Sequence, residues 1–345
     1  MSIRVAIDGL SGASRHILAA VAAGGFSDLF EVAHIHEAAG VSAIVHRLQR
    51  DSLYGRFPID VSGTDDSLTI GDTPVSVSST SEPGELDWSE LGIDLVVLGE
   101  STPTTGVRAE KHLERGAKKV VVAGTPGDLG KLVVFGVNES AYNPDAHHIV
   151  GTGSARLNAA AILANIVQQN FAIARGSFTV VHPPFPGQVA VDRAEDDPLA
   201  ARSLFNIVPH LHDSTSIELG LLSPILGSKL IGSVVCVPGV SPVAWLTVAI
   251  ETERRFERDD VVRVFKEAAG SDQYEGLLGI CDDLNLVSHD LIGDARSVVV
   301  SLDGLEMVGR AFVSIRGWFD AEWAMACRAA DLIAFLGEAG VPGTA

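Results

Sequence analysis

The chain has 345 residues, of which 46% are hydrophobic, and this is enough apolar material for about two domains with cores of their own. Its formal net charge of −19 argues against nonspecific binding to nucleic acid or to anionic membranes, while a local basic pocket for an anionic small-molecule ligand stays compatible with it. No stretch reaches the roughly 18 uninterrupted apolar residues of a membrane helix, and the N-terminus is typical of a first strand rather than a signal peptide, so we expect a cytoplasmic protein.

The first elements along the chain predict a dinucleotide-binding unit. Residues 3–7 form a short apolar strand, and the small-residue turn 8–15 follows it. A helix is expected over 16–23, and a second strand over 30–36 ends at the acidic Glu37. Strand, small-residue turn, helix, strand and acidic residue is the order of a dinucleotide-binding βαβ unit.

The rest of the first half extends this unit. Residues 60–83 are polar with alternating Val and Ile, which predicts a hairpin-like excursion. Apolar runs at 94–98 and 119–123 predict further parallel strands, and the segment 106–116 between them has a helical composition.

The second half has a different character. Residues 158–169 predict a buried helix, with 151–154 as its entry and capping loop. The pattern after it favours an α+β domain with an antiparallel sheet. Its expected strands are 177–181, 233–237, 243–251, 297–301 and 311–318, and its expected helices are 257–269 and 322–336.

Short signatures follow one another along nearly the whole chain. They are DGLSGASR (8–15), QRDSLYGRF (49–57), ESTP (100–103), VVFGVN (133–138), TVVH (179–182), NIVP (206–209) and WFDAEWAMACR (318–328). In this order and spacing they resemble NGFGRIGR, QYDSxHGKF, ESTG, FVMGVN, TTVH, NIIP and WYDNEFGYSNR of the glyceraldehyde-3-phosphate dehydrogenase family. Each match is weak alone, but the ordered set is not plausibly a coincidence.

The resemblance implies an α/β protein of two domains. Residues 1–154 would form a Rossmann NAD-binding domain, completed by a C-terminal helix over 322–345, and residues 155–321 a catalytic α+β domain with a mixed or antiparallel sheet. It also implies NAD or a related dinucleotide as ligand. Because the family is usually tetrameric, a homo-oligomer (tetramer or dimer) is expected.

The family's catalytic cysteine has no counterpart here. In the family it lies in SNASCTTN at a helix start, where it attacks an aldehyde before hydride leaves to the nicotinamide. The corresponding stretch, 151–158, reads GTGSARLN, with Ser154 and Asn158 on their counterparts. Ala155 therefore takes the cysteine position and Arg156 that of a phosphate-binding threonine. A methyl group forms no covalent intermediate, so the standard mechanism is not expected.

Three residues around this position carry candidate catalytic or substrate-binding roles. His182 stands where the family has its general base, and the alternative is a hydrogen-bonding histidine at a strand end. Arg156 is a candidate clamp for a carboxylate or phosphate, with a surface arginine as the alternative. Ser154 is expected to cap the helix beside the substrate. A role as substitute nucleophile is less favoured, because only His182 would offer it a base. The proline-rich residues 183–187 replace a polar loop of the family.

Cys236 stands at the position of the family's substrate-phosphate arginine, in the segment that resembles FRVP. It is a candidate relocated nucleophile, but a free cysteine is more often a small buried hydrophobe, and we favour that interpretation. Cys236, Cys281 and Cys327 are far apart and without CxxC spacing, so neither a disulfide framework nor a bound metal is expected.

The dinucleotide fingerprint is only partly kept. In GxGxxG the second glycine lets the backbone approach the pyrophosphate. Gly9 stays, whereas Ser11 and Ser14 take the next two glycine positions, with Gly12 relaxing the loop and the hydroxyls as candidate phosphate donors. Glu37 is placed like the family's ribose-binding acid. The candidate dinucleotide-binding residues are Gly9, Ser11, Gly12, Ser14, Arg15, Glu37, Ser101 and Thr102.

Three functions are compatible with these residues. The favoured one is acid/base chemistry of lyase, hydrolase or isomerase type, with His182 and Arg156 acting on a nucleotide-like, NAD-derived or other anionic molecule, for instance in specialised metabolism. Ala321 replaces the family asparagine that fixes the nicotinamide, which makes NAD a candidate substrate. The second function is that of a non-catalytic ligand-binding relative. The third is an NAD-dependent aldehyde dehydrogenase with Cys236 as nucleophile.

Overall fold

The structure is a computed structural model that describes residues 2–10, 12–22, 26, 29–80, 86–99, 105–184, 206–209, 215–238, 241–283 and 285–341. The chain divides into two compact units. The first comprises Met1–Val133, Ser140–Gly153 and Met325–Ala345, and the second Val134–Glu139 and Ser154–Ala324. No helix among the described residues is long and apolar enough to cross a membrane.

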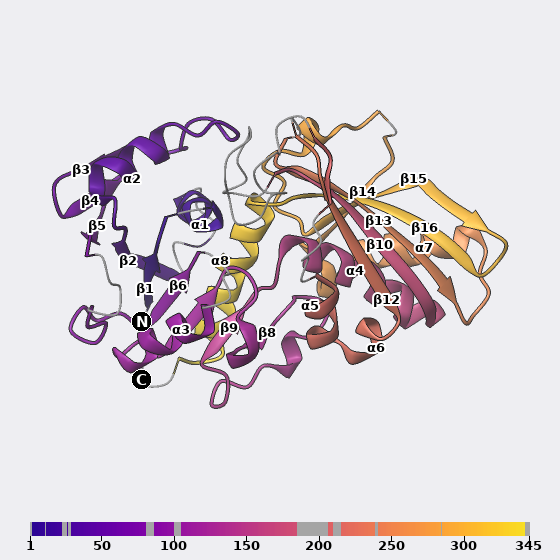
Figure 1. The fold of residues 1–345 in the computed structure, drawn as a ribbon, viewed down its shortest axis with the longest axis horizontal. Coiled ribbons are helices and arrows are strands. Elements are labelled where there is room, and N and C mark those ends of the chain that lie inside the picture. Colours follow the sequence, from indigo (N-terminus) through magenta and orange to yellow (C-terminus); the bar gives the residue numbers. More distant parts are fainter. Residues whose placement is uncertain are drawn as a thin grey trace. The chain divides into compact units, whose positions relative to one another are not determined.

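The first unit is built on a nine-stranded sheet in the order β3-β4-β5-β2-β1-β6-β7-β9-β8 (Figure 1). The strands from β5 to β8 run parallel, and β3 and β4 add an antiparallel edge. The strands are β1 Ile3–Asp8, β2 Phe30–His36, β3 Val61–Gly63, β4 Ser67–Ile70, β5 Thr73–Ser78, β6 Leu95–Leu98, β7 Lys119–Val122, β8 Lys131–Leu132 and β9 Ile149–Gly151. The helices are α1 Gly12–Ala22, α2 Gly40–Gln49, α3 Thr105–Glu114 and, from Met325 onward, α8 Trp323–Glu338.

The central strands of this sheet are mostly apolar because both faces are covered. Every residue of β6 and β7 is buried, as is usual for parallel strands between layers of helices. On one side Ala109 of α3 packs with Leu98, Val120 and Ile149. This buried framework places the carboxyl ends of β1 and β2 beside each other.

The second unit is built on a seven-stranded mixed sheet in the order β11-β12-β10-β13-β16-β15-β14. The pairs β10–β12 and β14–β15 are parallel and the others antiparallel. The strands are β10 Ile173–His182, β11 Val208–Pro209, β12 Leu230–Cys236, β13 Val243–Thr252, β14 Leu278–Cys281, β15 Val298–Val308 and β16 Phe312–Asp320. The helices are α4 Ala155–Phe171, α5 Thr215–Leu222, α6 Pro224–Gly227 and α7 Arg258–Ala269. Short 3₁₀ helices in the chain are η2 Gly127–Leu129, η3 Glu139–Ala141, η5 Asp272–Tyr274 and η6 Ser288–Leu291.

Helix α4 is the centre of the second unit. It packs against β10, β13, β15 and β16, and its first turns also contact α5 (Figure 1). Residues of β13 alternate between buried positions such as Leu246 and Val248 and half-exposed positions such as Thr247, so one face of the sheet meets the helix layer. The amino end of α4 therefore lies at a corner where α5 meets the helix.

The predicted fold class is confirmed, a Rossmann-type domain followed by a domain with a mixed sheet. Two helix starts were predicted too late. Helix α1 begins at Gly12 instead of residue 16, and α4 begins at Ala155 instead of residue 158. The helix α2, Gly40–Gln49, was not predicted, although its buried residues Val41, Ile44 and Leu48 follow a helical period.

Candidate functional site

The amino end of α4 is formed by a serine cap followed by an alanine. Ser154 is extended (φ −75°, ψ 157°), and its Oγ accepts a hydrogen bond from the backbone N–H of Leu157 at 3.1 Å. Ala155 is the first helical residue and is 8% exposed. Asn158 strengthens the cap, since its side-chain nitrogen donates to the carbonyl oxygen of Ser154 at 2.9 Å. The position that the resemblance gives to a nucleophile thus presents a methyl group.

Two side chains of this helix end are tied to α5. The Oγ of Ser154 lies 2.8 Å from Oε2 of Glu218, and Nε of Arg156 donates to Oγ1 of Thr215 at 3.2 Å. Glu218 is 2% exposed. From the sequence we expect Arg156 to clamp an anion, whereas Glu218 was not predicted as a site residue. The available signal was an acidic residue within the otherwise apolar helix α5, TSIELGLL.

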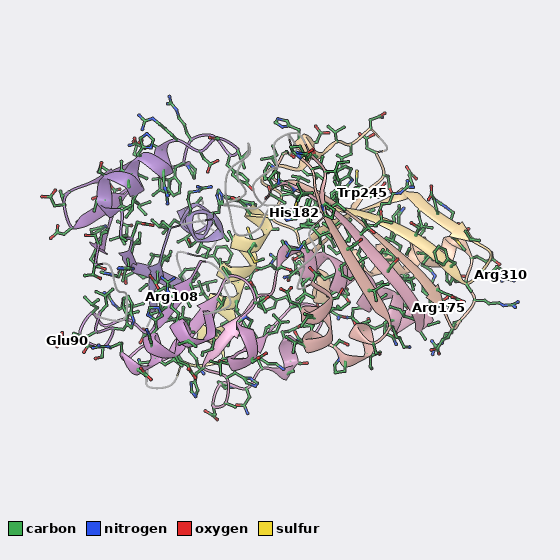
Figure 2. The ribbon with its side chains drawn as sticks, viewed as in Figure 1. Glu90, Arg108, Arg175, His182, Trp245 and Arg310 are labelled. Carbon is green, nitrogen blue, oxygen red and sulfur yellow. The ribbon has the colours of Figure 1, made fainter. Side chains whose placement is uncertain are left out.

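His182 and Cys236 are brought together by strand register. They are direct partners on the parallel strands β10 and β12, and both point to the buried face, with 6% and 1% exposure. Figure 2 shows His182 at the same end of the sheet as Trp245, which pairs with the preceding residue Val181. Cys236 is therefore the strand neighbour of His182, and its side chain is closed to solvent.

The tautomer of His182 follows from its hydrogen bond. Its Nδ1 lies 2.6 Å from the carbonyl oxygen of Pro183. Because a carbonyl oxygen only accepts, Nδ1 carries the hydrogen, and Nε2 is the basic atom of the neutral ring. This arrangement suits a proton acceptor. Of the proline-rich loop, Pro183 and Pro184 are described, while residues 185–187 lie outside the described part of the chain.

Ala321 lies directly after β16, where its backbone N–H donates to the carbonyl oxygen of Pro242 at 3.0 Å. The neighbouring Asp320 is fully buried and accepts hydrogen bonds from the N–H groups of Glu322 and Trp323 at the start of α8. The segment is thus ordered by Asp320, and Ala321 offers no side-chain amide or carboxyl group to a ligand.

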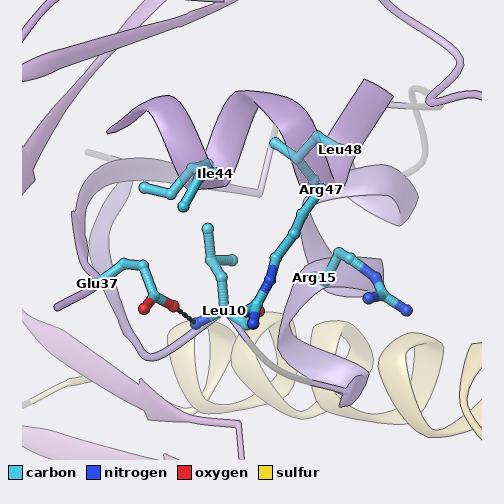
Figure 3. A pocket seen from close by; sticks show the side chains of 7 residues that line it. Leu10, Arg15, Glu37, Ile44, Arg47 and Leu48 are labelled. Atoms are coloured by element: carbon cyan, nitrogen blue, oxygen red, sulfur yellow. Dashed lines mark hydrogen bonds between the residues drawn. The ribbon is translucent and has the colours of Figure 1, made fainter. Parts of the chain in front are cut away.

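In the first unit, the turn after β1 has the geometry that a dinucleotide fingerprint requires. Gly9 has φ +84°, a conformation that favours glycine, and a Cβ built there would meet nothing within 4 Å. The Glu37 carboxylate accepts a hydrogen bond from the N–H group of Leu10 at 3.0 Å (Figure 3) and another from the N–H group of Ala39 at 3.2 Å. The acidic residue therefore orders the turn from the end of β2.

Ser14 has a packing role instead of the expected contact with a phosphate. It is fully buried and its hydroxyl donates to the carbonyl oxygen of Gly9 at 2.6 Å. A Cβ on Gly99, at the end of β6, would lie 2.3 Å from the Ser14 Oγ. The close approach of helix and strand, which the third fingerprint glycine normally permits, is provided here by Gly99.

Of the other predicted dinucleotide-binding residues, two belong to the described part of the chain and three do not. Arg15 forms an ion pair with Asp51 at 2.8 Å, so its guanidinium holds the 51–55 turn against α1. Gly12 begins α1. Ser11, Ser101 and Thr102 lie outside the residues that the structure describes.

A buried ionic cluster at the end of β1 was not predicted. The Asp8 carboxylate is fully buried and contacts His36 Nδ1 at 2.8 Å, His112 Nε2 at 3.0 Å and Arg108 Nη2 at 2.8 Å. Arg108, on α3, is labelled in Figure 2. The signals in the sequence were an aspartate where the resembling motif has asparagine, and the histidines of FEVAHIH in β2.

The protonation states of this cluster follow from its partners. His36 faces the Asp8 carboxylate and, at 2.9 Å, the carbonyl oxygen of Thr80, which both accept, so both ring nitrogens carry hydrogen and the ring is charged. His112 accepts the indole N–H of Trp88 at 3.0 Å and is therefore neutral. With Arg108, the cluster has one net positive charge.

The pKa values agree with this assignment. The hydrogen bond to Asp8 raises the pKa of His36 although burial opposes it. Burial alone would raise the pKa of Asp8, but hydrogen bonds from His112 and His36 and the charge of Arg108 outweigh it and lower that pKa well below its usual range. Burial, followed by the charge of His36, lowers the pKa of the neighbouring His34 to about 4.

The described residues of the first unit fit the phosphate and adenosine side of a dinucleotide. The open space at Gly9, the acidic residue after β2 and a net positive cluster at the strand end all lie at the carboxyl edge of a parallel sheet, where such ligands bind. In the second unit, Ala321 provides no group for a nicotinamide amide. Among the described residues, no group of three or more His, Cys, Asp or Glu side chains is arranged to hold a metal ion.

Comparisons with known proteins extend these observations. Residues 3–107 match the family model for the NAD-binding domain of glyceraldehyde 3-phosphate dehydrogenase, and residues 154–321 the model for its C-terminal domain. The chain is 32% identical to a glyceraldehyde-3-phosphate dehydrogenase of Streptomyces coelicolor, covering 98% of this chain and 99% of the relative. It is similar at 32% identity to glyceraldehyde-3-phosphate dehydrogenase 2 of Streptomyces arenae (98% and 99% covered) and at 28% to the Geobacillus stearothermophilus protein (99% and 100% covered).

Proposed function

The chain belongs to the glyceraldehyde-3-phosphate dehydrogenase family, and from that premise we propose that it is a repurposed enzyme and not a standard phosphorylating dehydrogenase. One observation carries the proposal: α4 begins with the methyl group of Ala155, while a buried His182 is kept at the end of β10. A thiohemiacetal needs a thiol at the helix start, whereas proton transfer needs only the imidazole.

The proposed chemistry is an acid/base step of lyase, hydrolase or isomerase type. The hydrogen bond from Nδ1 to Pro183 orients the ring, so Nε2 of His182 takes a proton from the substrate. Arg156 lies in the first turn of α4, where the helix dipole adds to its attraction for a carboxylate or phosphate.

The proposed ligand is nucleotide-like, NAD-derived or otherwise anionic. The match to an NAD-binding domain and the Gly9 turn with Glu37 support a dinucleotide, bound as cofactor or as substrate. When bound as cofactor, NAD supplies hydride acceptance. The residues that would hold its adenosine half are Gly9 and Glu37, and Ala321 leaves the nicotinamide without the family's amide contact.

The test follows candidate ligands by liquid chromatography and mass spectrometry. Purified protein is incubated with NAD, nicotinamide mononucleotide and glyceraldehyde 3-phosphate, and binding is measured by calorimetry. We expect conversion of at least one ligand without formation of NADH. His182→Asn should slow it on the order of 100-fold with unchanged affinity, because only proton transfer is lost.

The matched control is His289→Asn, which replaces an exposed histidine of η6 and should leave the rate unchanged. Equal rates for His182→Asn and the wild type would contradict the proposal. Tight binding of a ligand without any conversion would instead identify a non-catalytic ligand-binding relative.

The register of β10 and β12 favours one alternative, an NAD-dependent aldehyde dehydrogenase with Cys236 as nucleophile. His182 pairs with Cys236 on the adjacent strand, which supports a role for the imidazole as acceptor of the thiol proton. This candidate requires NADH to form from an aldehyde in the wild type and to disappear in Cys236→Ala. If Cys236→Ala keeps any aldehyde oxidation that the wild type has, this alternative is excluded.

A further inference from the structure

Ser154 and Glu218 form a partly buried hydroxyl–carboxylate contact between two helices, and the proposed chemistry does not use it. The two oxygens lie 2.8 Å apart, and Ser154 Oγ also accepts the N–H of Leu157. An ionised carboxylate only accepts hydrogen bonds, so the single hydroxyl hydrogen of Ser154 points at Glu218. The direction of the bond is that of a nucleophile toward its general base.

Helix capping does not explain the carboxylate. The cap needs only a lone pair of the serine oxygen, and a serine with no acid beside it serves equally well. Ser223 shows this in the same unit, since its Oγ accepts the N–H of Leu226 at 3.4 Å at the start of α6. A carboxylate that is 2% exposed costs free energy to bury. The buried Glu218 is therefore a feature beyond capping.

The contact is held between two packed helices. Thr215 and Glu218 are three residues apart and share one face of α5. Thr215 accepts from Arg156, and Glu218 accepts from Ser154, so two bonds fix this face against the first turn of α4. A nucleophile and base on rigid helices keep their alignment better than a pair on loops.

The helix start also favours negative charge on the reacting atoms. The macrodipole of the 17-residue helix α4 is positive at this end, which stabilises an alkoxide on Ser154 and an oxyanion formed beside it. One helix end suits the single charge of a tetrahedral acyl intermediate. A transferring phosphoryl group would need several cations or a metal ion, and the described residues of α4 and α5 contribute one cation here, Arg156.

We propose that Ser154 is a catalytic nucleophile with Glu218 as its general base, and that the substrate is a carboxylic ester or thioester. Ser154 Oγ bonds to the acyl carbon while its proton moves to Glu218. The bond to the leaving group breaks, and Glu218 returns the proton to that alcohol or thiol. Water then bonds to the acyl carbon, gives its proton to Glu218, and the acid is released as Ser154 recovers the proton.

This assignment rests on the proposed function in taking the second unit as catalytic, and it narrows the reaction to hydrolysis. It does not need His182 or the dinucleotide. A test on Ser154 alone therefore separates the two proposals: covalent modification of Ser154 can succeed while the His182 experiment fails, and the reverse also holds.

The experiment is covalent labelling of the full chain with an alkyl fluorophosphonate, which phosphonylates an activated serine with loss of fluoride, followed by peptide mapping. A pre-steady-state burst with p-nitrophenyl acetate gives a second readout. We expect the adduct on Ser154 and none in Ser154→Ala. Glu218→Gln should slow labelling on the order of 100-fold, because the base is removed while the shape is kept.

The matched control is Ser223→Ala, which deletes a helix cap without a carboxylate and should label like the wild type. Glu218→Asp, which keeps the charge but withdraws it by one methylene, serves if Glu218→Gln does not fold, and it should also label slowly. The absence of an adduct on Ser154 in the wild-type chain, or equal labelling rates in wild type and folded Glu218→Gln, overturns the proposal.

Discussion

At the scale of single residues, the start of α4 determines which chemistry is accessible. Ala155 occupies the position where a thiol would be activated by the helix dipole, and the side chains on either side of it, Ser154 and Arg156, are bound to α5. The change at this position is accompanied by others: Cys236 replaces an arginine of the family pattern, and Ala321 replaces an asparagine. The site differs from the family pattern at several positions at once, which is why one reversion is not expected to restore the family's reaction.

Ala155→Cys tests this expectation. The new thiol lies at the family's nucleophile position, but Arg156 and Cys236 stand where the family binds substrate phosphates, so glyceraldehyde 3-phosphate is not held for hydride transfer. We expect no NADH above the wild-type background, measured by absorbance with NAD and phosphate present. Mass spectrometry after alkylation verifies that the thiol is free. Sustained NADH formation by this variant would show that the family's phosphate sites are still functional.

At the scale of secondary-structure elements, the Asp8 cluster joins β1, β2 and α3 at the carboxyl edge of the first sheet. Asp8 comes from β1, His36 from β2, and Arg108 and His112 from α3. A buried carboxylate with two cationic partners is stable only while the partners stay charged. The cluster therefore makes the stability of the first unit depend on pH.

Asp8→Asn should destabilise the protein by about 3–5 kcal/mol near pH 6, because it leaves the charged His36 buried without its carboxylate. The folded-state pKa of His36 is raised, so its stabilisation is complete below its unfolded value of about 6.5 and is lost as pH rises through the folded value. The difference between wild type and Asp8→Asn should accordingly shrink by pH 9, measured by urea unfolding.

Asp94→Asn is the control for this experiment. It breaks the ion pair with Lys118, at 2.6 Å, which involves no histidine, so its effect should stay constant from about pH 6 to 9. If the cost of Asp8→Asn were equally constant over that range, the charged state assigned to His36 would be wrong.

At the scale of the whole molecule, one face of the seven-stranded sheet is only half covered. Trp245, Thr247 and Ala249 of β13 are half-exposed on it, and Thr247 Oγ1 is shielded from solvent without a hydrogen-bond partner among the described residues. A mostly antiparallel sheet can leave one face to solvent, but a buried hydroxyl is usually satisfied. We propose that a second copy of this chain covers the face, which makes the protein a homo-oligomer.

Ala249→Arg is the variant that tests the oligomer. Ala249 lies between Ser177 and Ser314 on the neighbouring strands, so an arginine there projects from the half-exposed face and is tolerated in a monomer. We expect light scattering to show an oligomer for the wild type and a smaller species for this variant. Glu110→Arg, on the exposed side of α3, should not change the mass. A monomeric wild-type protein would refute the proposed interface.

Local patterns in the sequence were sufficient for most of the fold. Runs rich in apolar residues located the strands β1, β2, β6 and β7, because parallel strands covered on both faces are mostly apolar. Helix starts were placed several residues late, because caps such as Ser154 and the glycine at position 12 mark them more weakly than the apolar residues that follow. The helix α2 was missed because its start at Gly40 follows Ala39, which makes no side-chain capping bond.

By itself the sequence determined the fold class and most of the order of the elements, and it predicted that Ala155 stands at the family's thiol position, since each depends on residue type and local spacing. Only the tertiary structure decided what surrounds that position. Ser154 meets Glu218 across 64 residues, and Asp8 meets His112 across 104. Such contacts arise when helices and strands pack and buried polar groups must find partners, and no periodicity along the chain encodes which distant residue will be the partner. The alanine thus remains the most informative residue in the sequence, and the buried carboxylate beside it is the contribution of the fold.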